Sequence, residues 1–219
     1  MAIRVMLVDD HDLVRFGIKS LLQNQLGIEV VSDVSSGEEC LEKCRIDPPD
    51  VILMDINMPG IGGFEATHRL QTICPNTKII IITVHSDGPL PKRLLEAGAV
   101  GYLTKGCEVQ EMVDAIHKVS KGLKYIAPSI AQQLALSMLP GNDSPIDTLS
   151  QRELQVLLMI SQGQRTSTIS DKLNLSPKTV STYRKRLHEK LGVTNDVEMM
   201  RLAIQHGILD DDIEEHINN

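Results

Sequence analysis

The chain has 219 residues, a formal net charge of −7 at pH 7, no tryptophan, 3 tyrosines and 2 phenylalanines. Its length predicts two domains, one of about 120 residues and one of about 65. Its longest apolar runs are only strand length and no signal peptide precedes the first, so we expect a cytoplasmic protein without a membrane span. The scarcity of aromatic side chains argues against base stacking. The cysteines form no CxxC pair and suit reduced thiols: Cys40, Cys44, Cys74 and Cys107.

Short apolar runs in the first half of the chain, at residues 3–8, 51–54 and 79–82, have the length and composition of buried strands. Helical stretches separate them, and this alternation predicts an α/β domain with a parallel sheet. A further strand-like run covers residues 100–104. Polar residues end or directly follow these runs: Asp9, Asp10, Asp55, Thr83 and Lys105. Since ligands of open doubly wound sheets bind outside the carboxyl ends of the strands, we expect these side chains to line one crevice.

The five residue types fit a phosphorylation switch. Clustered carboxylates repel one another and favour a hard divalent cation such as Mg2+, which takes oxygen ligands. A phosphoryl group on one carboxylate adds negative charge, which the cation neutralises on one side and Lys105 on the other, while the Thr83 hydroxyl donates to a phosphoryl oxygen. Any one of these residues is equally typical of a solvated loop, but all five in this order indicate the switch.

Residues 1–122 resemble the receiver domain of two-component response regulators in the acidic pair, in segment 54–60 around Asp55, and at Thr83, Tyr102 and Lys105. The resemblance implies a doubly wound sheet of five parallel strands with Asp55 as the phosphoryl acceptor. It further implies Mg2+ bound by Asp10, Asp55 and the backbone carbonyl of Asn57, with Asp9 supporting the metal indirectly.

Two positions depart from the receiver pattern. Gly106 stands where many receivers have proline, which removes the expectation of a cis-proline and leaves the loop freer. Val84 replaces a small residue, and we expect it to narrow access to the phosphoryl group and slow hydrolysis. Tyr102 is expected to transmit the signal together with Thr83, because Thr83 turning toward the phosphoryl group opens space for an aromatic ring. The alternative for Tyr102 is an ordinary half-buried sheet tyrosine.

Charge is distributed unevenly. Residues 1–146 hold 13 Lys and Arg against 18 Asp and Glu, a net of −5, whereas residues 147–209 hold 9 against 6, a net of +3. Residues 210–219 hold none against 5 and form an acidic tail. Residues 123–146, with their Pro, Gly, Asn, Asp and Ser cluster and a helical piece at 130–138, are the expected linker between the receiver and a second domain at 147–209.

The basic segment carries the signals of four helices. A capping box opens a helix over 150–161, and a short helix follows at 167–173. A serine cap and a proline begin a third, basic helix over 176–191, and a fourth is expected over 194–205. A short helix, a tight turn and a basic helix are the parts of a helix-turn-helix, whose second helix lies in the major groove of DNA.

Spacing along the third helix separates its faces. Val180, Leu187 and Leu191 mark the inner face. We expect base-facing and backbone-facing DNA contacts from the other faces: Ser181, Thr182 and Lys185 toward the bases, and Lys178, Thr179 and Arg184 toward the phosphates. The apolar residues of the fourth helix are candidates for a dimer contact or for the domain's own core, and we favour the core for most of them: Val197, Met200, Ala203 and Ile204.

Residues 147–209 resemble the LuxR-type output domain of the NarL/FixJ response regulators, in segments 149–153, 176–180 and 190–193. Further segments, at 10–15, 98–106 and 129–135, resemble the GacA/UvrY/LetA subgroup of that family. The resemblance implies a sensor histidine kinase of hybrid type as a partner, and binding of double-stranded promoter DNA as a homodimer. It implies promoters of small regulatory RNAs as the targets.

Two other classes of protein remain as alternatives. A stand-alone phosphotransfer receiver is disfavoured by the basic helix-turn-helix, and specific DNA binding with a steep salt dependence would separate the two. An aspartyl-phosphate hydrolase would share the aspartate nucleophile and Mg2+. Such an enzyme needs a second acid/base aspartate two residues after Asp55, where this chain has Asn57, so we expect no enzyme.

Overall fold

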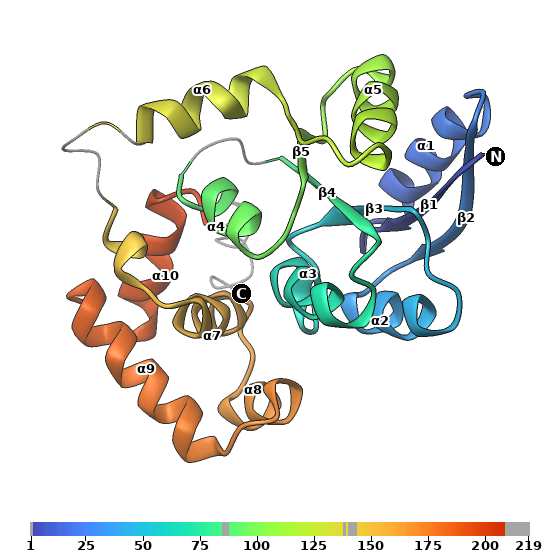
Figure 1. The fold of residues 1–219 in the computed structure, drawn as a ribbon. Coiled ribbons are helices and arrows are strands. Elements are labelled where there is room, and N and C mark those ends of the chain that lie inside the picture. The colour runs from blue at the N-terminus through green and yellow to red at the C-terminus, as the bar shows by residue number, and fades with distance from the viewer. Residues whose placement is uncertain (1, 85–87, 138, 140–143, 209–219) are drawn as a thin grey trace. The chain divides into compact units, whose positions relative to one another are not determined.

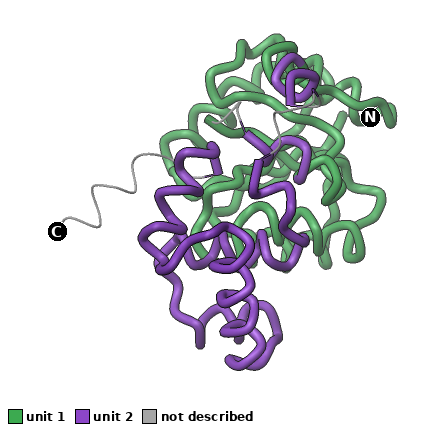
Figure 2. Tube along the Cα trace, turned by 90° about the vertical axis from the view of Figure 1, so that its left-hand side faces the viewer, with its two compact units in different colours: residues 1–86, 94–131 green, residues 87–93, 132–219 purple. Residues whose placement is uncertain are grey.

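The computed structural model describes residues 2–84, 88–137, 139 and 144–208. The chain forms two compact units, one of residues 1–86 and 94–131 and the other of residues 87–93 and 132–219 (Figure 2). Across the described ranges, no helix is both long enough and apolar enough to span a membrane. The expected acidic tail and residues 138 and 140–143 of the expected linker lie outside the described residues.

The first unit is built on a parallel sheet of six strands in the order β2-β1-β3-β4-β5-β6 (Figure 1). The strands are β1 (Ile3–Val8), β2 (Ile28–Val34), β3 (Val51–Asp55), β4 (Lys78–Thr83), β5 (Gly101–Thr104) and β6 (Tyr125–Ile126). The order confirms the doubly wound fold and adds one strand to the five expected. β6 lies in the segment predicted as linker, and two residues are too few to give a period-two pattern.

Helices cover both faces of this sheet, which is why the middle residues of its central strands β3 and β4 are all apolar. In Figure 1, α1 (Asp12–Gln23) and α5 (Val109–Ser120) lie on one face, and α2 (Gly37–Ile46) and α3 (Gly62–Ile73) on the other. Every residue of β3 is buried, as are residues 79–83 of β4. Helix α4 (Leu90–Glu96) contributes residues to both units. All four cysteines are free, as expected.

The remaining helices are α6 (Pro128–Ser137), a 3-10 turn η1 (Pro145–Thr148), α7 (Gln151–Ser161), α8 (Thr166–Leu173), α9 (Pro177–Leu191) and α10 (Asp196–Gln205). The last four confirm the predicted helices to within two residues at each end. Local hydrogen bonding sets these ends. The Ser150 hydroxyl accepts from the Glu153 amide at 3.3 Å, and the Glu153 carboxylate accepts from the Ser150 amide at 2.7 Å.

Helix α9, the predicted reading helix, is bounded by the residues that the sequence indicated. The Ser176 hydroxyl accepts from the Thr179 amide at 3.1 Å, and Pro177 takes the first helical position. The turn from α8 to α9 needs a left-handed residue, which Asn174 supplies with φ 53°. Gly192 ends α9 with φ 67°.

The core of the second unit corrects part of the prediction for α10. Ala203 is buried as expected, whereas Val197 is 52% exposed and Met200 and Ile204 are half-buried. The buried partner of Ala203 is Met199, which the sequence pattern missed. The inner face of α9 is confirmed, since its three predicted core residues are all buried: Val180, Leu187 and Leu191.

Candidate functional site

The register of the sheet brings the predicted receiver residues to one edge. Val8 of β1 pairs with Met54 of β3, so the acids that follow these residues leave neighbouring strands at the same level. Thr83 pairs with Thr104 on β5, which places Lys105 beside the end of β4. The sequence supplies this arrangement because each apolar run ends in a polar residue at the carboxyl end of its strand.

Asp9, Asp55 and Lys105 form a buried charged cluster. The Lys105 ammonium lies 2.8 Å from Asp9 Oδ2 and 3.1 Å from Asp55 Oδ2. Asp9 is 4% exposed and Asp55 is 3% exposed. The second Asp55 oxygen, Oδ1, accepts from the Ile56 amide at 2.8 Å. The backbone therefore fixes one oxygen of Asp55, while the other faces Lys105.

The environment of Asp55 disfavours its charge. Burial raises the pKa of Asp55, the positive charge of Lys105 opposes this, and the negative charge of Asp9 adds to it, so the pKa lies above its ordinary value. Burial alone would lower the pKa of Lys105, but the carboxylates of Asp55 and Asp9 outweigh it and raise that pKa. The cluster thus holds a firmly protonated lysine beside a carboxylate that is poorly compensated.

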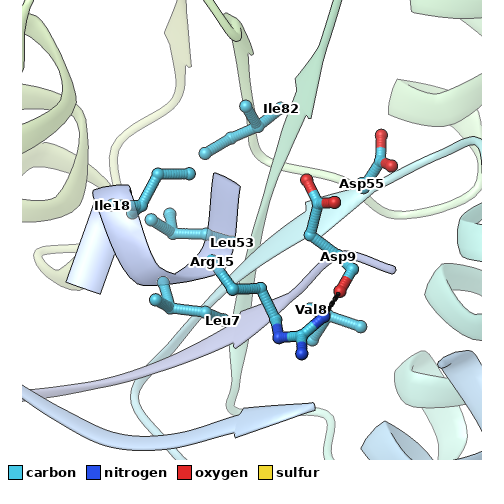
Figure 3. A pocket seen from close by; sticks show the side chains of 8 residues that line it. All are labelled: Leu7, Val8, Asp9, Arg15, Ile18, Leu53, Asp55 and Ile82. Atoms are coloured by element: carbon cyan, nitrogen blue, oxygen red, sulfur yellow. Dashed lines mark hydrogen bonds between the residues drawn. The ribbon is translucent and has the colours of Figure 1, made fainter. Parts of the chain in front are cut away.

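A cavity of about 10 Å3, roughly the volume that admits one water molecule, lies beneath the two acids. Figure 3 shows that Asp9 and Asp55 enter it from neighbouring strands, and that apolar side chains of β1, β3, β4 and α1 close it on one side. Arg15 of α1 donates to the backbone carbonyl of Asp9 at 2.5 Å, so it anchors the end of β1.

The acidic cluster has the donors of a cation site. One ligand atom from each of Asp9, Asp10, His11 and Asp55 lies within 4.8 Å of the others. Asp10 Oδ1 and Asp55 Oδ2 are buried and form no hydrogen bond within the described part of the chain, although each lies near a basic group. Oxygen-rich donors with unused lone pairs fit a hard divalent cation. Asn57 lies two residues after Asp55, and its backbone N–H donates a hydrogen bond to the Asp55 carboxylate.

The predicted switch residues lie next to this cluster. Thr83 and Tyr102 are both fully buried, at 0% exposure. The Tyr102 hydroxyl has no hydrogen-bond partner among the residues that the structure describes, and burial raises the pKa of this hydroxyl. Val84 is 60% exposed at the mouth of the strand ends. A Cβ at Gly106 would meet no heavy atom within 4 Å, in agreement with an open loop.

Sequence reasoning gave no role to three residues of this site. The His11 ring nitrogen Nδ1 lies 3.2 Å from Asp9 Oδ1 and 3.0 Å from Asp10 Oδ1; adjacency to the acidic pair was the available signal. For Arg15, the only indication in the sequence was its position one helical turn after Asp12, with which it forms an ion pair. Gly63 allows the loop after β3 to close, because a Cβ there would lie 1.9 Å from the Asp55 carbonyl oxygen.

The second candidate site is the exposed side of α9. Of its predicted contact residues, four are exposed and two are half-buried: Lys178, Ser181, Thr182 and Lys185, and then Thr179 and Arg184. A hollow of about 310 Å3 lies on this side, and three of its lining residues were not predicted as DNA contacts: the cap residue Ser176, Tyr183 and Arg186. Its other lining residues are the predicted contacts Lys178, Thr179 and Thr182. Arg186 could have been predicted, because it lies eight residues after Lys178 and four after Thr182, on the same face of the helix.

An α/β unit with an aspartate–lysine cluster, followed in the chain by a helix-turn-helix, defines a DNA-binding signalling protein. Two family models match the chain: response regulator receiver domain over residues 5–117, and bacterial regulatory proteins, luxR family, over residues 147–203. The chain therefore belongs to the NarL/FixJ family of two-component response regulators, which carry a LuxR-type DNA-binding domain. These are transcription regulators and not enzymes.

Individual relatives agree with this family. Response regulator GacA of Pseudomonas aeruginosa is 53% identical over 210 residues, which cover 95% of this chain and 98% of that protein. Response regulator UvrY of Escherichia coli K12 is 51% identical over 208 residues, covering 94% and 95%. Among solved structures, the RcsB–DNA complex matches with a TM-score of 0.59 and 26% identity, over 92% of this chain and 98% of that one.

Proposed function

We propose that this chain is phosphorylated on Asp55 by a sensor histidine kinase in a Mg2+-dependent reaction, and that the phosphorylated form binds promoter DNA as a dimer. The observation that carries the proposal is the buried Asp55 with one oxygen fixed by the backbone and the other 3.1 Å from Lys105. A cytoplasmic location follows from access to DNA and to the kinase.

The transfer itself is a displacement at phosphorus. A lone pair of an Asp55 oxygen forms the new P–O bond, and the bond from phosphorus to the donor's histidine nitrogen breaks with its electron pair, which leaves on the imidazole. A small acyl phosphate would react in the same way and release its carboxylate. The raised pKa of Asp55 makes this carboxylate a more basic nucleophile, and the Lys105 ammonium stabilises the charge that collects on the phosphoryl oxygens.

Mg2+ would be held by Asp10, Asp55 and the backbone carbonyl of Asn57, with Asp9 supporting this group. When bound, the cation supplies positive charge that offsets the charge of the incoming phosphoryl group. Asp9 forms an ion pair with Lys105, and this pair holds the Lys105 ammonium at the mouth of the site.

Thr83 and Tyr102 form the proposed switch. The unpartnered, buried Tyr102 hydroxyl costs about 1–3 kcal/mol, so the buried position of this ring is only weakly favoured in the absence of phosphate. Thr83 bonded to a phosphoryl oxygen would shift that balance. A ligand shifts an equilibrium only by its differential affinity for the two states, and the phosphoryl–Thr83 bond provides that difference.

DNA binding is assigned to α9. Ser181, Thr182 and Lys185 reach base edges, whereas Lys178 and Thr179 contact phosphates. RcsB, a relative in structure, has been solved bound to DNA, which supports this use of the domain. The exposed Val197 of α10 is available for a dimer contact, and a dimer predicts two inverted half-sites about one helical turn apart. The likeness to GacA and UvrY supports promoters of small regulatory RNAs as targets and a hybrid kinase as donor.

Phosphodonor labelling tests the receiver half of the proposal. Acetyl phosphate should label the full chain only when Mg2+ is present, and a duplex selected by the chain from a random pool should then bind more tightly. Asp55→Asn should abolish both effects. Labelling of the Asn variant at the wild-type level would refute the assignment of Asp55.

Footprinting tests the DNA half. The phosphorylated chain should protect two half-sites on its selected duplex, and removal of either half-site should weaken binding to the other. Full affinity for one isolated half-site, without protection of a second, would refute the dimer while leaving the helix-turn-helix intact.

A further inference from the structure

Arg184, predicted as a phosphate contact, is engaged inside the protein. Its guanidinium donates through Nε to Asp196 Oδ1 at 2.8 Å and through Nη2 to Asp196 Oδ2. His188, one helical turn further along α9, places Nε2 3.0 Å from the same Asp196 Oδ1. One carboxylate on α10 therefore binds two side chains on a single face of α9.

The carboxylate itself is held in place by the start of α10. Asp196 is the first residue of that helix, directly after the Asn195 cap, whose side chain accepts from the Glu198 amide at 2.9 Å. Glu198 in turn accepts from the Thr194 amide at 2.7 Å. Gly192, with φ 67°, and Thr194 complete a connection of only four residues between the two helices. This connection leaves Asp196 little freedom to move relative to α9.

The pair is more consistent with holding α9 in place than with contacting DNA. A guanidinium in a forked pair uses a rigid geometry that matches one carboxylate, and its charge is already compensated. A phosphate would have to displace Asp196 before Arg184 could bind it. The carboxylate of the pair is partly shielded, since the Asp196 side chain is 26% exposed, against 44% for Arg184 and 25% for His188.

We propose that Asp196 is a positioning residue for DNA reading, which acts through Arg184 and His188 to fix the rotation of α9 against α10. Fixed in this way, α9 presents Thr182 and Lys185 to base edges at one defined angle. The inference rests on the proposed role of α9 as the reading helix. According to this inference, Asp196 does not touch DNA, and it affects how well the domain discriminates between sequences and not how tightly it binds DNA overall.

The test compares two duplexes, one selected by the wild-type chain from a random pool and a scrambled duplex of the same composition. The dissociation constant of each is measured on the full chain over a range of salt concentrations. Asp196→Asn should lower the ratio of selected to scrambled affinity about tenfold, the effect of about one mismatched base pair. Asp171→Asn is the matched control, because it also removes one negative charge from the second unit, at an exposed position on α8. It should leave the ratio unchanged.

Variants of Arg184 separate positioning from direct contact. Arg184→Lys keeps the charge but cannot form the forked pair, so it should lower the ratio as Asp196→Asn does. Arg184→Gln should lower the ratio without changing the salt slope, and the double variant with Asp196→Asn should be no worse than either single variant. If Arg184→Gln reduced the salt slope by about one while Asp196→Asn left the ratio intact, Arg184 would be a phosphate contact and the proposal would be overturned.

Two outcomes concern folding and the underlying function. Arg184→Lys is the mildest change, and its circular dichroism spectrum and melting curve should match those of the wild type. A lower ratio of selected to scrambled affinity, together with an unchanged melting curve, supports positioning. If Lys178→Ala and Lys185→Ala also left both affinities unchanged, α9 would not be the reading helix. That result would refute the proposed function as well as this inference, whereas an effect of these lysines without an effect of Asp196 would refute the inference alone.

Discussion

Replacing Asp55 with asparagine should make the chain more stable in the absence of metal. The raised pKa of Asp55 means that its ionised form is less favourable in the folded protein than in the unfolded chain. The contribution of this group to stability is therefore fully present below its unfolded pKa and is lost as the pH rises through the raised folded value. At neutral pH an uncharged side chain of the same shape avoids that loss.

The magnitude follows from three interactions of Asp55. The Asn variant gives up attraction to Lys105 at 3.1 Å, worth about 5 kcal/mol at an effective dielectric constant of 20. It escapes a desolvation penalty of several kcal/mol and the repulsion from Asp9, and it keeps the bond from the Ile56 amide. The direction of the pKa shift gives the sign of the balance, and single stabilising substitutions commonly gain about 0.5–2 kcal/mol.

Differential scanning calorimetry in EDTA, on the full chain, measures this balance. The transition of the receiver unit is the one that Mg2+ moves, and Asp55→Asn should raise its midpoint by about 4 °C for each kcal/mol, as expected for a domain of this size. The advantage should grow from about pH 4, near the ordinary pKa of Asp in the unfolded chain, and level off above the raised folded pKa. Mg2+ should narrow the advantage by binding the wild type more tightly. An Asn variant that is less stable than the wild type at pH 7 in EDTA would refute the reasoning.

Three further predictions concern lysines with different partners. Lys105→Ala should still accept phosphate from acetyl phosphate, at a reduced rate, but a DNA-binding titration should show no gain in affinity, and full activation would place the switch elsewhere. Lys185→Ala should lose about 1–3 kcal/mol of binding free energy on the selected duplex and relax the preference at particular base pairs. Lys178→Ala should weaken binding to all duplexes alike and reduce the salt slope by about one. Identical binding profiles for the two variants would contradict their assigned roles. Lys190→Met should destabilise the chain by about 1 kcal/mol in urea melts, because Lys190 lies 2.7 Å from Glu153. Burial raises the pKa of Glu153, but hydrogen bonds from Lys190 and Ser150 outweigh it and lower that pKa, so the deficit should be present at neutral pH and vanish as the pH falls through the carboxyl range; a deficit that persisted in acid would point to packing instead.

The sequence was sufficient for the receiver because strand ends are local features. An apolar run that stops at Asp9, Asp55 or Thr83 identifies both the strand and its polar end, and a parallel sheet then aligns these ends at one edge. The same holds for α7 and α9, whose caps at Ser150 and Ser176 lie within three residues of the amides that they bind.

Contacts between distant residues could not be read in this way. Arg184 was predicted as a phosphate contact from its place on the basic helix, yet it binds Asp196 on α10, and Lys190 of the same helix binds Glu153 on α7. Charge counting does not distinguish a lysine paired inside the domain from one that faces solvent. Val197 shows the same limit for apolar residues, because helical spacing marks a stripe but does not say which neighbour covers it.

The sixth strand determines where the receiver can be cut from the chain. β6 continues the sheet beyond β5: the Tyr125 amide donates to the Val100 carbonyl, and the Ala127 amide donates to the Tyr102 carbonyl, both at 3.0 Å. A chain shortened to residue 122 would leave these two carbonyls unpaired on an open edge next to the switch tyrosine. Unpaired edges recruit strands from other molecules, so such a fragment would tend to self-associate. A fragment that extends to residue 131, the limit of the first unit, keeps both carbonyls paired with β6.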